Sequence, residues 1–154
     1  EVNLSDFDLF RVVHNIVASV EASSSAGKYD GVRYGHRSSS GKNWNDMYLN
    51  SRGESFGLLI KTFLYQGAYF QFENYPAFEN ACRNRRRLVQ AVVDLLGQVD
   101  LLVFPTMRLG HDAEKAATIN HIYDAFLLTL PANVTGQPSL HVPSLALHSE
   151  VDIG

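Results

Sequence analysis

Apolar side chains near the amino end of the chain recur every three or four residues, which predicts a helix with one buried face. Ser5, followed three residues later by Asp8, resembles a capping box, and Gly27 offers a stop, so these residues set the expected limits. The apolar positions of this helix are Phe10, Val13, Ile16, Val17 and Val20.

The same periodicity predicts two further helices in the middle of the chain. One opens with a capping box at Ser51 and continues to about Phe72, with an interruption expected at Gly67. The other starts at residues 74–76, where proline is tolerated in the first turn, and runs to Gly97. The expected buried stripe of the first of these helices is Phe56, Leu59, Ile60, Phe63 and Leu64.

The last third of the chain mixes helical and strand-like patterns. Residues 101–104 are a continuous apolar run ended by Pro105, which predicts a strand buried on both faces. Residues 120–130 are predicted to be helical and to end at Pro131, and residues 140–142 are predicted to form another strand. Helices combined with such strands predict the α/β fold class.

Composition limits the classes of partner. The chain has 154 residues, 45% of them hydrophobic and 19% charged, which is typical of a globular protein. A net charge of -3 gives no overall attraction to nucleic acid or to acidic membranes. A basic cluster at Arg83 and Arg85–Arg87 is interpreted as a solvated, ion-paired helix face, with a local contact to RNA or to an acidic partner as the alternative.

No pattern in the sequence predicts a cofactor or a metal ion. The six histidines include no pair at the spacing of a zinc-binding helix, and the lone Cys82, expected to be a small buried residue, excludes a thiolate cluster. Residues 35–43 resemble a phosphate loop, but their glycine spacing is wrong and Asn43 stands where Ser or Thr is needed. The serine runs at residues 23–25 and 38–40 lack the strand-turn-helix frame that aims the nucleophile of a serine hydrolase.

Targeting signals are also missing from the sequence. No apolar run approaches the roughly 18 residues that cross a bilayer, and no secretory pattern is present. The prediction is a protein of the cytoplasm or mitochondrial matrix that is neither secreted nor bound to a membrane.

The most specific stretch of the chain is Glu21–Gly35, which ends in Tyr-Asp-Gly-Val-Arg-Tyr-Gly. Together with later blocks it resembles the carboxy-terminal half of the amidase signature family, and most closely the A subunits of glutamine-dependent aspartyl/glutamyl-tRNA amidotransferases. The later blocks are Asp46–Tyr48, Arg52, Phe56–Gly57, Gly67, residues 100–106 and residues 131–138. The resemblance implies a partial amidase-signature fold, with helices packed on a mixed β-sheet.

The resemblance also implies how the function is divided along the chain. The family hydrolyses amides with a Ser-Ser-Lys triad, and those residues lie upstream of the matching blocks, so no catalytic residue is expected here. Arg33 matches the family arginine that holds the α-carboxylate of glutamine. The family acid for the substrate amino group corresponds in position to Phe126, and Asp124, two residues earlier, is the nearest acidic candidate.

Residues 1–154 are therefore expected to be one piece of an amidase-like domain, incomplete at both ends. Its expected partners are amidotransferase subunits of the B and C type, with tRNA contacted through them, or another large assembly. A catalytically inactive amidase remnant that serves as a structural subunit is the alternative, and a hydrolase of small amides is a third hypothesis.

Overall fold

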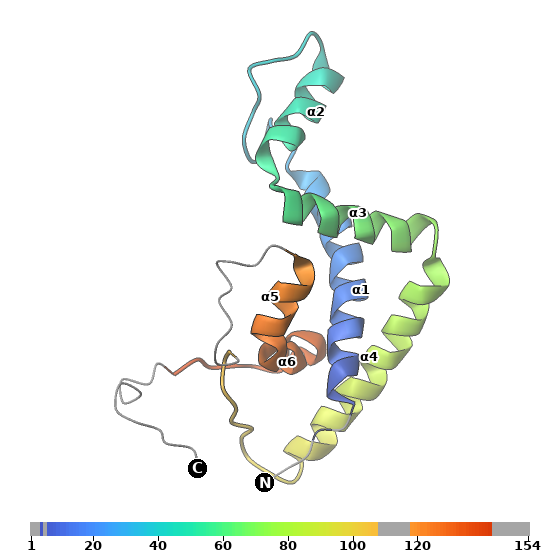
Figure 1. Ribbon diagram of the computed structural model, residues 1–154, viewed down its shortest axis with the longest axis vertical. Helices are drawn as coiled ribbons and strands as arrows, with labels where there is room; N and C mark the ends of the chain where they lie inside the picture. Colours follow the sequence, from blue (N-terminus) through green and yellow to red (C-terminus); the bar gives the residue numbers. More distant parts are fainter. Residues whose placement is uncertain (1–3, 5, 108–117, 143–154) are drawn as a thin grey trace.

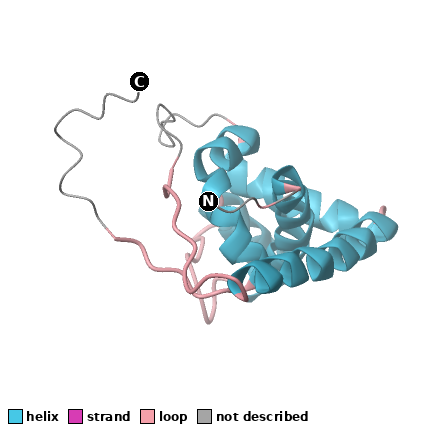
Figure 2. Ribbon diagram, turned by 90° about the horizontal axis from the view of Figure 1, so that it is seen from below, coloured by secondary structure: helices cyan, strands magenta, loops and turns pink. Residues whose placement is uncertain are grey.

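The computed structural model of the protein describes Leu4, residues 6–107 and residues 118–142. In this part of the chain all regular secondary structure is helical (Figure 2). The α-helices are α1 (Phe7–Ser25), α2 (Trp44–Ser55), α3 (Leu58–Phe72), α4 (Tyr75–Leu96), α5 (Ile119–Phe126) and α6 (Leu130–Thr135), and short 3-10 helices span Ala26–Lys28 and Leu127–Thr129.

Helix α1 is the central element, and α3, α4 and α6 all contact it (Figure 1). Helix α4 lies along α1, α3 crosses it, and α2 extends beyond α3. Apolar side chains of α1, α4, α5 and α6 meet in a shared core, which explains why these helices stay together. The core residues are Phe10, Val13, Val17, Ala81, Leu88, Val92, Tyr123, Leu130 and Val134.

The predictions for α1 and α4 are confirmed. The periodic apolar residues of α1 face the core, and Phe10 is fully buried. The α-helix ends at Ser25, and a 3-10 turn carries the chain on to Lys28. Ser5 lies outside the described residues, so its capping role stays a prediction. Helix α4 begins at Tyr75, as the position of the proline predicted, and is followed by Gly97.

The single helix predicted from Ser51 to Phe72 is wrong in its limits. The structure has two helices there, α2 and α3, separated at Phe56–Gly57. Helix α2 starts earlier than expected because the Asn43 side chain accepts a hydrogen bond from the backbone N–H of Asp46 and caps the helix. The predicted buried stripe is also wrong in part, since Ile60 is exposed.

Gly67 does not interrupt α3 but lies where α3 crosses α1. A Cβ atom at this position would overlap the backbone carbonyl of Ser19. Ser19 is itself fully buried, and its hydroxyl donates to the carbonyl of Ile16. The two backbones approach this closely because glycine has no side chain, so the glycine serves the helix crossing.

The predicted α/β fold class is wrong for the described residues, which contain no strand and therefore no mixed sheet. Residues 101–104 and 140–142 have no regular secondary structure, and Val103 is 91% exposed. Four apolar residues can form a strand only when another strand accepts and donates their backbone hydrogen bonds. Periodicity cannot supply that partner, and the described part of the chain offers none.

Two smaller expectations are also corrected. Pro131 does not close a helix: it lies in the first turn of α6, where a missing N–H costs nothing. Helix α6 ends at Thr135 and is followed by Gly136 in the left-handed conformation. Cys82, expected to be buried, is exposed on α4. Among the described helices, none is both long and apolar enough to cross a membrane.

Candidate functional site

The turn that carries Arg33 is ordered by one carboxylate. The Oδ1 atom of Asp30 accepts hydrogen bonds from the backbone N–H groups of Val32 and Arg33, each at 2.9 Å. These backbone hydrogen bonds favour the ionised form and lower the pKa of Asp30 to about 2. Asp30 is therefore charged at neutral pH, and its charge holds the backbone of the turn.

Gly31 lets this turn lie directly on α2. Its φ of 72° is in the left-handed region, and its N–H donates to the carbonyl of Tyr34 at 3.1 Å. A Cβ atom on Gly31 would lie 2.7 Å from the hydroxyl oxygen of Ser51. A larger residue at position 31 would therefore push the turn away from α2.

Arg52 of α2 joins the turn to the end of α1. Its Nη1 atom donates to the carbonyl of Ala26 at 2.7 Å, and its guanidinium lies over the rings of Tyr48 and Phe56 at 5.4 and 5.3 Å. The ring of Phe56 in turn meets Tyr29 edge to face. These contacts of Arg52 and Phe56 hold the residues that lead into the turn, from Ala26 to Tyr29, against α2.

Serine hydroxyls and Glu54 hold the return half of the loop. The buried hydroxyl of Ser51 accepts the backbone N–H of Ser38 at 2.9 Å and donates to the carbonyl of Met47. Ser38 donates to Glu54 at 2.7 Å, and the other oxygen of Glu54 meets His36 at 2.6 Å. The hydrogen bonds from His36 and Ser38 lower the pKa of Glu54.

Arg33 is the side chain that this framework presents to solvent. Its Nε atom lies 3.4 Å from Oδ2 of Asp30, and the side chain is 75% exposed. Within the described residues no partner is recorded for its two terminal nitrogens. A guanidinium held at Nε with both terminal nitrogens available can bind a carboxylate through two parallel hydrogen bonds.

Asp124, the second predicted binding residue, lies on α5 and contacts a different part of the molecule. Its carboxylate forms an ion pair with Arg11 of α1 at 2.8 Å, and Arg11 also donates to Asn120 at 3.2 Å. Arg11 lies in the first half of α1, whereas Arg33 follows the opposite end of that helix. The structure does not bring the two predicted binding residues together, and their roles stay predictions.

Next to Asp124, Tyr123 links α5 to α1 by a half-buried hydrogen bond to Nδ1 of His14 at 2.8 Å. Burial lowers the pKa of His14, with a smaller opposing effect of Glu21, and raises the pKa of Tyr123 to about 12. Both groups are therefore neutral at pH 7. The interpretation of His14 as a structural residue agrees with this geometry.

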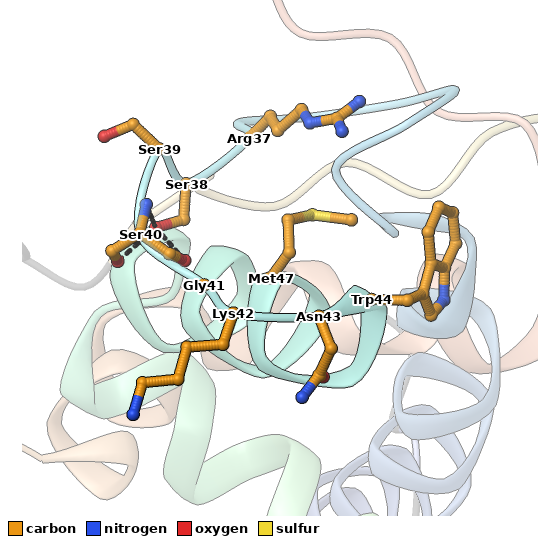
Figure 3. A pocket seen from close by; sticks show the side chains of 9 residues that line it. All are labelled: Arg37, Ser38, Ser39, Ser40, Gly41, Lys42, Asn43, Trp44 and Met47. Atoms are coloured by element: carbon orange, nitrogen blue, oxygen red, sulfur yellow. Dashed lines mark hydrogen bonds between the residues drawn. The ribbon is translucent and has the colours of Figure 1, made fainter.

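A cavity of about 390 Å³ opens between residues 37–44 and Met47 (Figure 3). Its lining includes Arg37, Lys42 and Trp44, but the side chain of Lys42 extends away from that of Arg37. Asp46 already accepts the backbone N–H of Lys42 at 3.3 Å, which places a negative charge beside the first turn of α2. The cavity therefore does not combine its cations into one anion site.

Two arginines of the basic cluster on α4, Arg83 and Arg85, have acidic partners. Arg83 lies 3.6 Å from Glu79, and Arg85 lies 3.8 Å from Glu21 and donates to the carbonyl of Val134 at 2.8 Å. These contacts support the interpretation as an ion-paired helix face. In the part of the chain that the structure describes, no group of three or more His, Cys, Asp or Glu side chains is arranged around a metal ion.

Sequence reasoning missed the role of Arg52 and Ser51 in positioning the turn. A signal was present for Arg52, because Tyr48 and Phe56 stand four residues before and after it, at the spacing of neighbours on one helix face. No local signal marks Ser51, since its partner Ser38 lies 13 positions away.

A family model described as Amidase matches residues 1–154. The chain is also similar to the A subunit of glutamyl-tRNA(Gln) amidotransferase from Streptococcus uberis, with 33% identity over 153 residues. The corresponding protein of Streptococcus thermophilus is 32% identical over 151 residues. Each match covers 94% of this chain but only 30% of the relative.

The chain therefore belongs to the amidase family, and its relatives include amidotransferase A subunits. This confirms the resemblance inferred from the Glu21–Gly35 stretch and the later blocks. The chain spans less than a third of the length of the curated relatives that it matches.

Proposed function

We propose that residues 1–154 form the carboxy-terminal, substrate-recognition and scaffold segment of a glutamine-dependent tRNA amidotransferase of the A-subunit type. In this proposal the segment supplies Arg33 to bind glutamine, and the amide-hydrolysing residues lie outside residues 1–154. The enzyme would release ammonia from glutamine for the amidation of mischarged Glu-tRNA or Asp-tRNA, together with B- and C-type subunits. Membership of the family and the names of the relatives support the reaction class.

The geometry of the Arg33 turn is the observation that carries the proposal. Asp30 fixes the backbone and holds Nε, so the guanidinium needs little further ordering to bind a carboxylate. A surface cation without such support would lose more side-chain entropy on binding.

The test is glutamine hydrolysis by the intact protein with its companion subunits, comparing Arg33→Ala, Arg33→Lys and Arg37→Ala. Losing a hydrogen-bonded charge partner costs about 1.5–3 kcal/mol, so Arg33→Ala is expected to lower kcat/KM for glutamine about 10–100-fold. Arg33→Lys keeps the charge but loses the fork, and we expect it to recover only part of the activity.

Arg37 is the matched control because it is an exposed arginine of the same loop. Arg37→Ala should leave kcat/KM for glutamine unchanged. Equal losses in the Arg33 and Arg37 variants would show a general charge effect, and unchanged turnover in Arg33→Ala would reject the assignment of Arg33.

A catalytically inactive remnant with a structural role in a larger assembly is the second candidate. The observation in its favour is the environment of the second binding position: the carboxylate of Asp124 is paired with Arg11, and Phe126 occupies the place of the family acid. Absence of glutaminase activity with all companion subunits supplied would favour this candidate. Sustained glutamine turnover would exclude it.

A further inference from the structure

A cavity of about 90 Å³ lies among α1, α4 and α6, which contact one another beside the shared core (Figure 1). A single water molecule needs about 10–15 Å³, so this cavity has room for a molecule of about six heavy atoms. Its lining includes Val13, Val17 and Val134, which are buried core residues. A ligand of this size would therefore contact the apolar core.

Glu21 and Arg85 bring one negative and one positive charge to the lining of this cavity. Oε1 of Glu21 lies 3.8 Å from Nη1 of Arg85, beyond the range of about 2.7–3.2 Å for an N–H···O hydrogen bond. The two groups attract each other without completing a hydrogen bond, so each keeps the capacity to bind a ligand. Glu21 also opens the most specific stretch of the sequence, and the proposed function gives it no role.

The guanidinium of Arg85 is positioned by the backbone of α6. Its Nε atom donates to the carbonyl of Val134 at 2.8 Å, and within the described residues no partner is recorded for Nη2. The side chain of Arg85 is 42% exposed and that of Glu21 is 68% exposed, so a ligand can reach both from solvent. A guanidinium fixed at Nε presents its terminal nitrogens to a carboxylate.

Two neutral side chains of the lining add a donor and an acceptor. Burial raises the pKa of Tyr123 to about 12, so its hydroxyl keeps its proton at neutral pH and donates to Nδ1 of His14 at 2.8 Å. The proton of the neutral His14 ring is then on Nε2, which can donate to a ligand. Asn133 binds a backbone carbonyl through Nδ2 at 3.0 Å, which leaves its Oδ1 atom as an acceptor.

These groups select a ligand that carries both charges. A pure anion would meet the carboxylate of Glu21, a pure cation would meet the guanidinium of Arg85, and like charges at close range are costly. We propose that this cavity binds a small zwitterionic amino acid of the size of glycine or alanine. Its carboxylate contacts Arg85 and His14. Its ammonium group contacts Glu21 and Asn133.

This assignment is separate from the proposed function. The cavity shares no residue with the Arg33 turn, and glutamine is too large for its volume. The turnover of glutamine and the binding of a small amino acid can therefore be measured independently.

The experiment is a calorimetric titration of L-alanine into the intact protein with its companion subunits, using the Arg33→Ala variant. That variant lacks the arginine proposed to bind glutamine, so binding that remains belongs to another site. We expect saturable binding in the millimolar range. Propionate lacks the ammonium group and ethylamine lacks the carboxylate, and each should bind at least about 10-fold more weakly.

Glu21→Gln in the same background removes the charge and keeps the shape of the side chain. We expect it to weaken the binding of alanine about 10–100-fold, because the ammonium loses its charged partner. Glu79→Gln on α4 is the matched control, since Glu79 is also an exposed glutamate beside an arginine, Arg83. The control should leave the affinity for alanine unchanged.

NMR of the protein labelled at its valine methyl groups tests the site without a substitution. L-alanine should shift the methyl signals of Val13 and Val17, which line the cavity. The signals of Val93, an exposed residue of α4, should stay in place.

Four outcomes would overturn the proposal. They are the absence of both saturable binding and valine shifts, equal affinities for alanine and for propionate or ethylamine, equal effects of Glu21→Gln and Glu79→Gln, and binding of alanine that disappears in Arg33→Ala. The last outcome would place alanine at the Arg33 turn. Loss of glutamine turnover in Arg33→Ala without any binding of alanine to the cavity would reject this inference and leave the proposed function intact.

Discussion

The helical core and the loop region that carries Arg33 are held together by different forces. In the core, apolar side chains of α1, α4 and α6 are excluded from water, and Phe10 is fully buried. The arm, which we define as residues 29–57, has few buried apolar groups, Met47 being the main one. Its turns are fixed by side chains that bond to backbone groups, chiefly those of Asp30, Ser51 and Arg52.

This difference explains how an exposed arginine is positioned. Apolar packing would bury Arg33 and remove it from a ligand, whereas bonds to the backbone order the turn and leave the guanidinium in water. The comparison also predicts different sensitivities: the core should respond to changes of volume, and the arm to the loss of single polar atoms.

The largest effect is expected at the helix crossing. Gly67→Ala introduces a Cβ that overlaps the carbonyl of Ser19, and because that atom is backbone, the helices must separate. Overpacking of this kind should lower the free energy of unfolding by about 3 kcal/mol. Urea unfolding of the protein, followed by circular dichroism, measures the change.

Gly53→Ala in α2 is the matched control, because a Cβ there meets no atom within 4 Å. The higher helix propensity of alanine should raise stability by about 0.5–1 kcal/mol. A loss of stability in both variants would mean that the crossing is not specifically crowded, and the contrast between core and arm would fail.

A smaller effect is expected from one hydroxyl in the arm. Ser51→Ala removes the acceptor for the backbone N–H of Ser38 in a buried setting. Leaving that donor unsatisfied should cost about 2 kcal/mol. Ser39→Ala, at an exposed position of the same loop, should change stability by less than about 0.5 kcal/mol. Similar unfolding midpoints for the two variants would show that the buried bond does not hold the arm.

The smallest effect is local and depends on pH. The pKa of Asp30 is lowered from 3.8 to about 2 by the backbone hydrogen bonds of Val32 and Arg33. Because the folded pKa lies below the unfolded value, the contribution of Asp30 is complete above about pH 4 and is lost as the pH falls through about 2. The amide chemical shifts of Val32 and Arg33, followed by NMR, should titrate over this range.

Asp30→Asn should abolish that titration, while Asp94→Asn on α4 should leave it intact. A titration midpoint near 3.8 in the unmodified protein would show that the carboxylate does not hold the turn.

Local sequence patterns correctly predicted the helices whose start, end and apolar spacing are all marked by residues close together in the sequence. Helix α1 has regular apolar spacing, and α4 has a proline near its start and a glycine after its end. The same patterns predicted one helix from Ser51 to Phe72, because Ser51 and Glu54 resemble a capping box. The structure has two helices there, and the residue that caps the first of them is Asn43. The patterns also placed strands at residues 101–104 and 140–142, since apolar runs indicate burial but do not supply a strand partner.

For the candidate site, the sequence identified the motif around Arg33 but not the residues that position it. Asp30 and Gly31 stand within the motif, whereas Ser51 and Arg52 reach it from another helix. The pairing of Asp124 with Arg11 spans 113 positions and has no local signature. Asp124, predicted to bind a ligand, is therefore paired with Arg11 in the folded chain, and the sequence gives no sign of this ion pair.

The sequence by itself determined the family, through the Glu21–Gly35 stretch, and the course of α1 and α4, because these depend on residues close together along the chain. Only the tertiary structure decided that Gly67 serves a helix crossing, that Asp124 faces Arg11, and that Leu58 and Tyr65 of α3 are exposed. Those features depend on distances between residues far apart in sequence, which packing sets and local periodicity does not contain.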